Sequence, residues 1–184
     1  KPEETRSHNM CGILGYIGKR DFDAEAFGRA LDVMKNRGPD DRGIYEEPDV
    51  LLGHRRLSIL DLSPAGHQPM ISPDGRYVIV YNGEVYNFKE LQKPLEEEGA
   101  RFRSSSDTEV ILNLYAREGP SCIDRFRGMF AIAIWDRVER RLFLARDRMG
   151  IKPLYVWCFP EGSGVASHVK ALRALPSGPK EPNP

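Results

Sequence analysis

The sequence predicts an α+β fold built in layers, with antiparallel sheets. Two apolar runs, at residues 129–136 and 141–147, flank a short polar segment, a pattern typical of a buried hairpin. Strand-like and helix-like segments also follow one another without the regular alternation that parallel sheets require. With 184 residues, the chain is long enough to bury a sizeable core as one domain.

The first part of the chain supplies two strands, one helix and two loops. An apolar run punctuated by glycines predicts a buried strand at 11–18, and one apolar helical face predicts a helix within 23–36. A turn-rich loop at 36–43 leads to a predicted strand at 51–60. The next loop, at 63–75, contains three prolines.

The second part adds two helices and further strands. Residues 77–87 are rich in β-branched and aromatic residues and predict a strand that stops at Asn82–Gly83. A charged amphipathic helix is expected at 88–98, and Asp107 is expected to N-cap the next helix. Residues 153–157 predict a third strand near the hairpin.

Composition at the two ends predicts the domain limits. Residues 1–10 are polar, lack apolar periodicity and are expected to form a disordered leader or tag. Residues 176–184 are rich in proline and are expected to form a disordered tail. The single domain is therefore predicted to span residues 11–175.

The charge balance argues against binding to polyanions. Lysine plus arginine and aspartate plus glutamate both number 27, so the formal net charge is zero. Neither nucleic acid nor an anionic membrane surface is an expected partner. No apolar run approaches the roughly 20 residues that span a bilayer, and the polar N-terminus does not resemble a signal peptide.

Cysteine and histidine usage argues against a disulfide scaffold and a metal site. Cys11, Cys122 and Cys158 lie far apart without a CxxC pair, which favours free thiols in a reducing, cytoplasmic setting. The four histidines share no metal-ligand spacing, and no phosphate-binding glycine motif occurs. We therefore expect no metal and no cofactor.

Cys11 is the first candidate for chemistry. It directly follows Met10, and if the chain began at Cys11 its free α-amine, with a reference pKa of about 7.7–8.0, would be a usable base. Thiol and base would then lie on one residue. The alternative is that Cys11 is simply a small, buried apolar side chain.

The pair Asn82–Gly83 is the second candidate. A strand that ends there can direct an amide side chain and an unhindered backbone N–H to one point, as in an oxyanion hole. The alternative is a type I′ turn, for which Asn–Gly is the favoured pair. Glu84 fits such a turn poorly and favours a site.

Two charged positions suit recognition of an amino acid. Arg55 and Arg56 lie on a predicted strand, so their side chains face opposite ways and one can enter a pocket to bind a carboxylate. Asp107 can bind an ammonium group at a helix start. The alternatives are two solvated arginines and an ordinary helix cap.

Seven motifs in order carry a family resemblance. They are MCGILGYIG, NRGPDDRGIY, GHRRLSILDL, YNGEVYNF, SSSDTEVIL, GMFAIAIWD and ARDRMGIKPLY. Together they resemble the glutamine-hydrolysing domain of asparagine synthetases, which are class II glutamine amidotransferases. The resemblance implies an N-terminal-nucleophile hydrolase fold, a four-layer αββα sandwich with two antiparallel sheets.

The same resemblance implies a reaction and its residues. L-glutamine is the expected substrate, with glutamate and ammonia as products. Cys11 is the implied nucleophile with its α-amine as base, while Asn82 and Gly83 are the implied oxyanion donors. No metal or organic cofactor is implied.

Substrate binding is implied for three further residues. Arg56 is expected to pair with the glutamine α-carboxylate, and Asp107, helped by Glu84, with the α-ammonium. Arg55 is expected to lie outside the site.

The chain also departs from its implied relatives. It contains no Ser-Gly-Gly-x-Asp-Ser pyrophosphate motif, so a synthetase domain or subunit is expected as the partner that accepts ammonia. His168 occupies a position where relatives usually carry glutamate, which we interpret as a degenerate domain boundary. We expect the chain to be inactive until residues 1–10 are removed, because an acylated Cys11 has no amine base.

Two other functions remain open at this level. One is a catalytically silent module that binds glutamine or a partner protein. The other is a cysteine hydrolase of the Cys/His type, which would need His54 or His67 beside Cys11.

Overall fold

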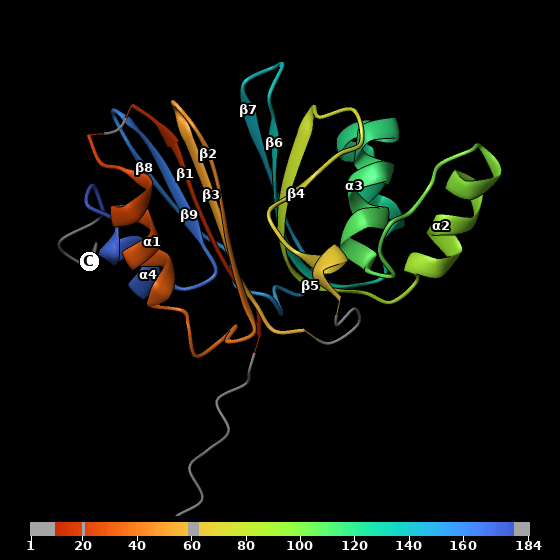
Figure 1. Cartoon of the computed structure of the whole chain (residues 1–184), viewed down its shortest axis with the longest axis horizontal. Helices are drawn as coiled ribbons and strands as arrows, with labels where there is room; N and C mark the ends of the chain where they lie inside the picture. The colour runs from red at the N-terminus through yellow and green to blue at the C-terminus, as the bar shows by residue number, and fades with distance from the viewer. Residues whose placement is uncertain (1–9, 20, 59–62, 179–184) are drawn as a thin grey trace, which may run out of the picture.

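Two antiparallel sheets packed face to face form the centre of the molecule, and helices cover both outer faces (Figure 1). This computed structural model describes residues 10–19, 21–58 and 63–178. The predicted leader, up to residue 9, and residues 179–184 of the predicted tail lie outside the described residues. The layers confirm the predicted α+β class and the four-layer αββα arrangement.

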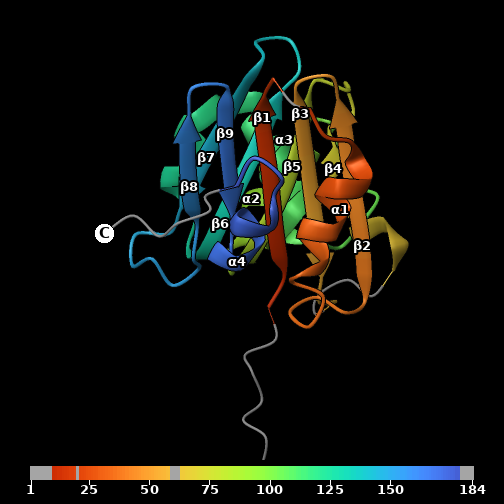
Figure 2. The same ribbon diagram turned by 90° about the vertical axis from the view of Figure 1, so that its left-hand side faces the viewer.

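The first sheet has five strands, and two helices cover its outer face (Figure 2). In order across the sheet they are β2 (Asp41–Glu47), β3 (Val50–Arg56), β1 (Gly12–Gly18), β9 (Gly162–Ala166) and β8 (Tyr155–Phe159). The covering helices are α1 (Ala24–Asp32) and α4 (Val169–Ala174).

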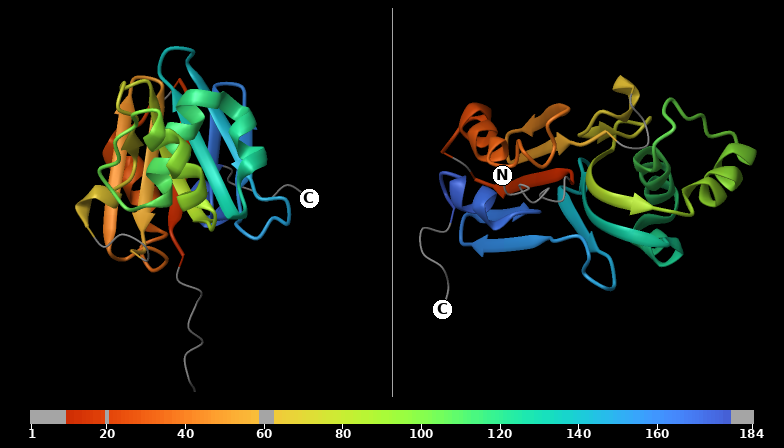
Figure 3. Two further views of the ribbon diagram at one scale, coloured as in Figure 1. Left: turned by 90° about the vertical axis from the view of Figure 1, so that its right-hand side faces the viewer. Right: turned by 90° about the horizontal axis from the view of Figure 1, so that it is seen from below.

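The second sheet has four strands, with helix α3 packed against its outer face (Figure 3). The strand order is β4 (Met70–Ile71), β5 (Tyr77–Val85), β6 (Gly128–Asp136) and β7 (Arg141–Arg146). The helices on this side are α2 (Phe88–Glu97) and α3 (Asp107–Glu118), with short 3-10 turns at Pro64–Gly66 and Gly119–Arg125.

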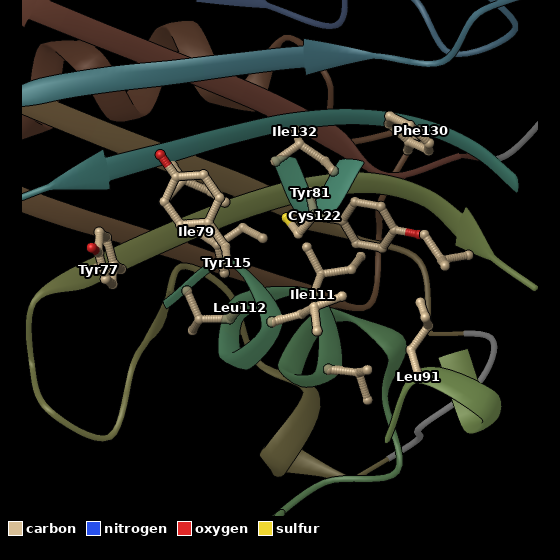
Figure 4. Packing of buried hydrophobic residues seen from close by; sticks show 14 of the residues in the cluster. Tyr77, Ile79, Tyr81, Leu91, Ile111, Leu112, Tyr115, Cys122, Phe130 and Ile132 are labelled. Carbon is tan, nitrogen blue, oxygen red and sulfur yellow. The ribbon is translucent and has the colours of Figure 1, made fainter. Parts of the chain in front are cut away.

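Strand alternation explains why the first half of β5 is apolar at every position. In β5, Tyr77, Ile79 and Tyr81 point toward α3, as Figure 4 shows, whereas Val78 and Val80 point toward the other sheet. A strand buried on both faces has no polar face to show in its sequence. The same alternation builds three apolar layers, one between the sheets and one under the helices of each side.

The sequence predicted several elements correctly. The expected hairpin is β6 paired with β7, and the strand at 11–18 is β1. The helices expected within 23–36 and at 88–98 are α1 and α2.

Other predictions were wrong at particular points. The loop expected at 36–43 contains the start of β2, and the third strand, expected beside the hairpin, is β8 of the other sheet. Within the described residues, the strand expected at 51–60 begins at Val50 and ends at Arg56. The sequence also did not predict β9 or α4.

His168 has a structural role in the observed fold. It is the N-cap of α4, where its Nδ1 accepts a hydrogen bond of 3.1 Å from the backbone N–H of Lys170. Burial lowers the pKa of His168, which favours the neutral form that can accept this bond.

Candidate functional site

One pocket collects four of the six predicted site residues. Cys11, Arg56, Gly83 and Asp107 all line it, although they lie on four separate segments of the chain. They come from the residue before β1, the end of β3, the interior of β5 and the start of α3. The pairing of β1 with β3 and the facing of the two sheets bring these segments together.

Cys11 sits at the start of β1 with its sulfur turned to the chain beyond β3. Its Sγ accepts a hydrogen bond from Leu57 N at 3.4 Å and donates to Leu57 O at 3.6 Å. Burial raises the pKa of the thiol, whereas the Leu57 hydrogen bond and the positive charges of Arg56 and Lys152 lower it. The sulfur is thus partly buried and lies in a positively charged environment.

Strand β5 continues through Asn82–Gly83, so the alternative of a type I′ turn is wrong. Asn82 pairs with Ala131 of β6 and Gly83 with Phe130. A side chain at position 83 would not fit, because a Cβ there would lie 2.3 Å from the carbonyl oxygen of Met129. Glycine therefore lets a strand pass close to β6 at the pocket wall.

The backbone N–H groups on one edge of β5 point toward the pocket side. Tyr81 N donates to the side chain of Gln68 at 2.7 Å, and Val85 N donates to Asp107 at 2.9 Å. Alternate residues of a strand share this direction, so the N–H of Gly83 points to the same side. Gly83 thereby presents a backbone donor to the pocket that it lines.

Asn82 carries a buried amide donor. Its side chain is 1% exposed and lies on the same face of β5 as Val78 and Val80, toward the layer between the sheets. Its Nδ2 has no hydrogen-bond partner among the residues that the structure describes. Because an unpaired buried donor costs about 1–3 kcal/mol, such a group indicates a function.

Asp107 is a buried carboxylate whose hydrogen-bond donors are uncharged. It is the first residue of α3, whose N-cap is Ser106, so the prediction that Asp107 is the cap was wrong. Its Oδ2 accepts hydrogen bonds from Tyr81 Oη at 2.7 Å and from Val85 N. Burial raises the pKa of Asp107, while these two bonds lower it.

The side chains of Arg55 and Arg56 point to opposite faces of β3, as the alternation of side chains along a strand predicts. Arg56 lines the pocket and donates to the carbonyl oxygen of Ser63 at 3.0 Å. Arg55 lies 3.5 Å from Asp32 in an ion pair and does not line the pocket. Both arginines are buried, so the alternative of two solvated side chains is wrong.

Asn82 and Glu84 are the two predicted site residues that do not line the pocket. Glu84 nevertheless raises the pKa of Asp107 through its negative charge. Its expected contact with a substrate ammonium stays a prediction.

Neither candidate histidine supports a Cys/His hydrolase. His54 is fully buried, and its Nε2 lies 3.0 Å from the carbonyl oxygen of Tyr81. Burial lowers the pKa of His54 to about 3, so the ring is neutral and Nε2 donates. His67 bonds Asp41 at 2.7 Å, and neither ring lines the pocket.

Sequence reasoning missed part of the pocket wall. Gln68 accepts from Tyr81 N through Oε1 and donates to Thr108 Oγ1 at 3.2 Å through Nε2. Ser106 has a buried hydroxyl without a partner in the described part of the chain. Adjacency to Asp107 could have indicated Ser106 and Thr108, but no local signal indicates Gln68.

Neither a metal-binding cluster nor a membrane-spanning helix is found among the residues that the structure describes. In the described ranges, no group of three or more His, Cys, Asp or Glu side chains could hold a metal ion. No helix there has the length and apolar character needed to cross a bilayer.

Comparison with known proteins decides the family. The family profile described as "Glutamine amidotransferase domain" matches residues 10–183. The chain belongs to this family. It is 40% identical to asparagine synthetase [glutamine-hydrolyzing] 3 of Bacillus subtilis over 174 residues, which is 91% of this chain. It is also 40% identical to asparagine synthetase B [glutamine-hydrolyzing] of Escherichia coli, over 89% of this chain.

These relatives are much longer than the amidotransferase region. The match covers 28% of the Bacillus subtilis protein and 30% of the Escherichia coli protein. Among solved structures, glutamine phosphoribosylpyrophosphate amidotransferase from Bacillus subtilis superposes on 90% of this chain with a TM-score of 0.76. That match covers 43% of the amidotransferase chain at 22% identity and supports the fold alone.

Proposed function

We propose that this amidotransferase domain hydrolyses the side-chain amide of L-glutamine to glutamate and ammonia, with Cys11 as nucleophile. The observation that carries the proposal is the pocket that holds a thiol together with a guanidinium and a buried carboxylate. The names of the relatives, which include the words glutamine-hydrolyzing, support the choice of substrate.

The opposite charges of the pocket suit the two ends of an amino acid. Arg56 pairs with the substrate α-carboxylate, because a guanidinium matches the geometry of a carboxylate. Asp107 receives the α-ammonium, and Glu84 adds negative charge nearby. The side-chain amide of a substrate held this way is free to reach the Cys11 sulfur.

The proposed reaction proceeds through a thioester. The thiolate of Cys11 attacks the amide carbon, and the developing oxyanion accepts hydrogen bonds from Asn82 Nδ2 and Gly83 N–H. The α-ammonium of Cys11 gives a proton to the departing ammonia. The same amine then activates a water molecule that hydrolyses the thioester, which releases glutamate and restores the thiol.

This mechanism requires Cys11 to begin the chain. The amine is a base only when no residue precedes it, so we propose that cleavage before Cys11 is needed for full activity. A synthetase domain or subunit is the proposed acceptor of the ammonia. Because the reaction needs a reduced thiol, the cytoplasm is the proposed location.

The test compares three forms of the protein in an assay for glutamate and ammonia. The form cut before Cys11, with its first residue verified by mass, should release both products in equal amounts. Cys11→Ala in the same cut form should release neither, and the uncut chain should be about 10²–10⁴ slower. No glutamate from the verified cut form, or full activity of the uncut chain, would contradict the proposal.

A further inference from the structure

Lys152 is a buried cation that contacts Met10, the residue before Cys11, and the proposed mechanism does not use it. Its side chain is only 6% exposed, yet it forms no ion pair with any carboxylate in the described ranges. Its Nζ lies 3.1 Å from the uncharged sulfur of Met10. A buried ammonium with only a weak neutral acceptor is costly, which indicates that its charge serves another group.

A short, firmly bonded loop between β7 and β8 holds Lys152 in place. The buried carboxylate of Asp147 accepts hydrogen bonds of 2.9 Å from the backbone N–H groups of Ile151 and Lys152. The guanidinium of Arg146 donates to the carbonyl oxygens of Lys152, at 2.8 Å, and Gly150. Gly150 has φ +64°, which permits the tight turn between them.

The charges around Lys152 single out the thiol as its partner. Burial lowers the pKa of Lys152, and the strongest opposing influence is the negative charge that Cys11 carries when ionised. Glu84 and Asp147 also favour the ammonium, but more weakly, whereas Arg37 opposes it. Seen from Cys11, the positive charges of Arg56 and Lys152 lower the pKa of the thiol, and Arg37 also interacts with the charge of Cys11.

We propose that Lys152 is a positioning residue whose ammonium is the counter-ion of the nucleophilic Cys11 thiolate. Arg56 is assigned above to the substrate. Of the other two cations whose charge acts on the sulfur, Lys152 is among the larger influences on the thiol and Arg37 is not. This inference rests on the proposed function for its catalytic consequence. The effect on the thiol itself is present whether or not the protein hydrolyses glutamine.

The contact with Met10 fits this assignment. When the chain is cut before Cys11, the Met10 sulfur leaves and the ammonium stands beside the new N-terminal residue. A positive charge there favours the thiolate and opposes protonation of the α-amine. The thiolate is the form that attacks, and a less basic α-amine gives the proton taken from the thiol more readily to the departing ammonia.

The first experiment measures the thiol directly. Cys11 is alkylated with iodoacetamide across pH 6–10 in the cut protein, and the rate at Cys11 is followed by peptide mass. In Lys152→Met the apparent pKa of the thiol should rise, so the rate at pH 7 should fall roughly three- to tenfold. Lys152→Arg should retain the rate, and Lys170→Met, at an exposed lysine of α4, is the matched control.

The second experiment records kcat/KM for glutamine against pH in the same variants. In Lys152→Met the acidic limb should move to higher pH while KM changes little, and Lys152→Arg should restore it. An unchanged alkylation profile in a folded Lys152→Met protein would overturn the inference. A different result would separate the two proposals. If the alkylation rates of the variants change as expected but the wild type hydrolyses no glutamine, the proposed function is contradicted and the counter-ion role of Lys152 stands.

Discussion

At the residue scale, the site is marked by polar groups that the protein buries without satisfying them. Asn82 Nδ2 and Ser106 Oγ have no partner among the described residues, and Asp107 is buried among uncharged donors. In a stable fold such groups each cost free energy. Ser106 and Asp107 line the pocket with Cys11, and Asn82 precedes the pocket residue Gly83. A ligand with an oxyanion and an ammonium would complete these groups.

Asn82→Ala tests the oxyanion donor. Removal of one such donor typically costs about 10²–10³ in rate. In the cut protein we expect kcat for glutamine hydrolysis to fall by this factor while KM changes less, because the interaction forms mainly in the transition state. If the variant keeps the wild-type kcat, Asn82 is not an oxyanion donor.

Asp107→Asn tests recognition of the substrate ammonium. The amide keeps the size of the side chain and can still accept from Tyr81 and Val85, but it loses the charge. We expect KM to rise at least tenfold with a smaller change in kcat, measured by steady-state kinetics. Arg55→Met is the matched control at a buried charge outside the pocket, and an equal rise in its KM would show that the effect is not specific.

At the element scale, β5 shows both the reach and the limit of local sequence patterns. The β-branched and aromatic residues at 77–81 predict a strand correctly, yet the Asn–Gly pair suggested that it stops. Pairing with β6 overrides the local turn preference and carries the strand to Val85. Gln68 could not be predicted, because its contacts with Tyr81 and Thr108 depend on the tertiary fold.

Gly83→Ala tests the close approach of β5 to β6. The added methyl group would lie 2.3 Å from the Met129 carbonyl oxygen and 2.7 Å from the Cα of Phe130. The backbone must therefore shift, which should lower the free energy of unfolding by about 1–3 kcal/mol and displace the Gly83 N–H. Urea unfolding and the glutamine assay measure the two effects, and a variant normal in both would contradict the close approach.

At the scale of the whole molecule, polar contacts fix the two sheets relative to each other. His54 of β3 donates to the Tyr81 carbonyl of β5, near the pocket. At the opposite end of the sheets, Glu47 of β2 accepts from Trp135 of β6 at 3.2 Å and from Arg137 at 2.7 Å. The hairpins predicted antiparallel sheets and the family resemblance implied the four layers, but the sequence could not show these long-range contacts.

The buried His54 predicts how stability depends on pH. Its pKa falls from 6.5 to about 3 on folding, so the unfolded chain binds one more proton between these values. Stability is therefore highest above pH 6.5 and falls as pH decreases, by about 1.4 kcal/mol per pH unit from this group. His54→Gln should remove this part of the slope in urea unfolding at pH 4.5–7, and an unchanged slope would contradict a neutral, buried His54.

The most direct test of the central claim is covalent labelling of the cut protein by diazo-oxo-norleucine, an electrophilic glutamine analogue. The account predicts one adduct, located on Cys11 by peptide mass, that forms more slowly when L-glutamine is present. Labelling only at Cys122 or Cys158, or labelling that glutamine does not slow, would contradict it.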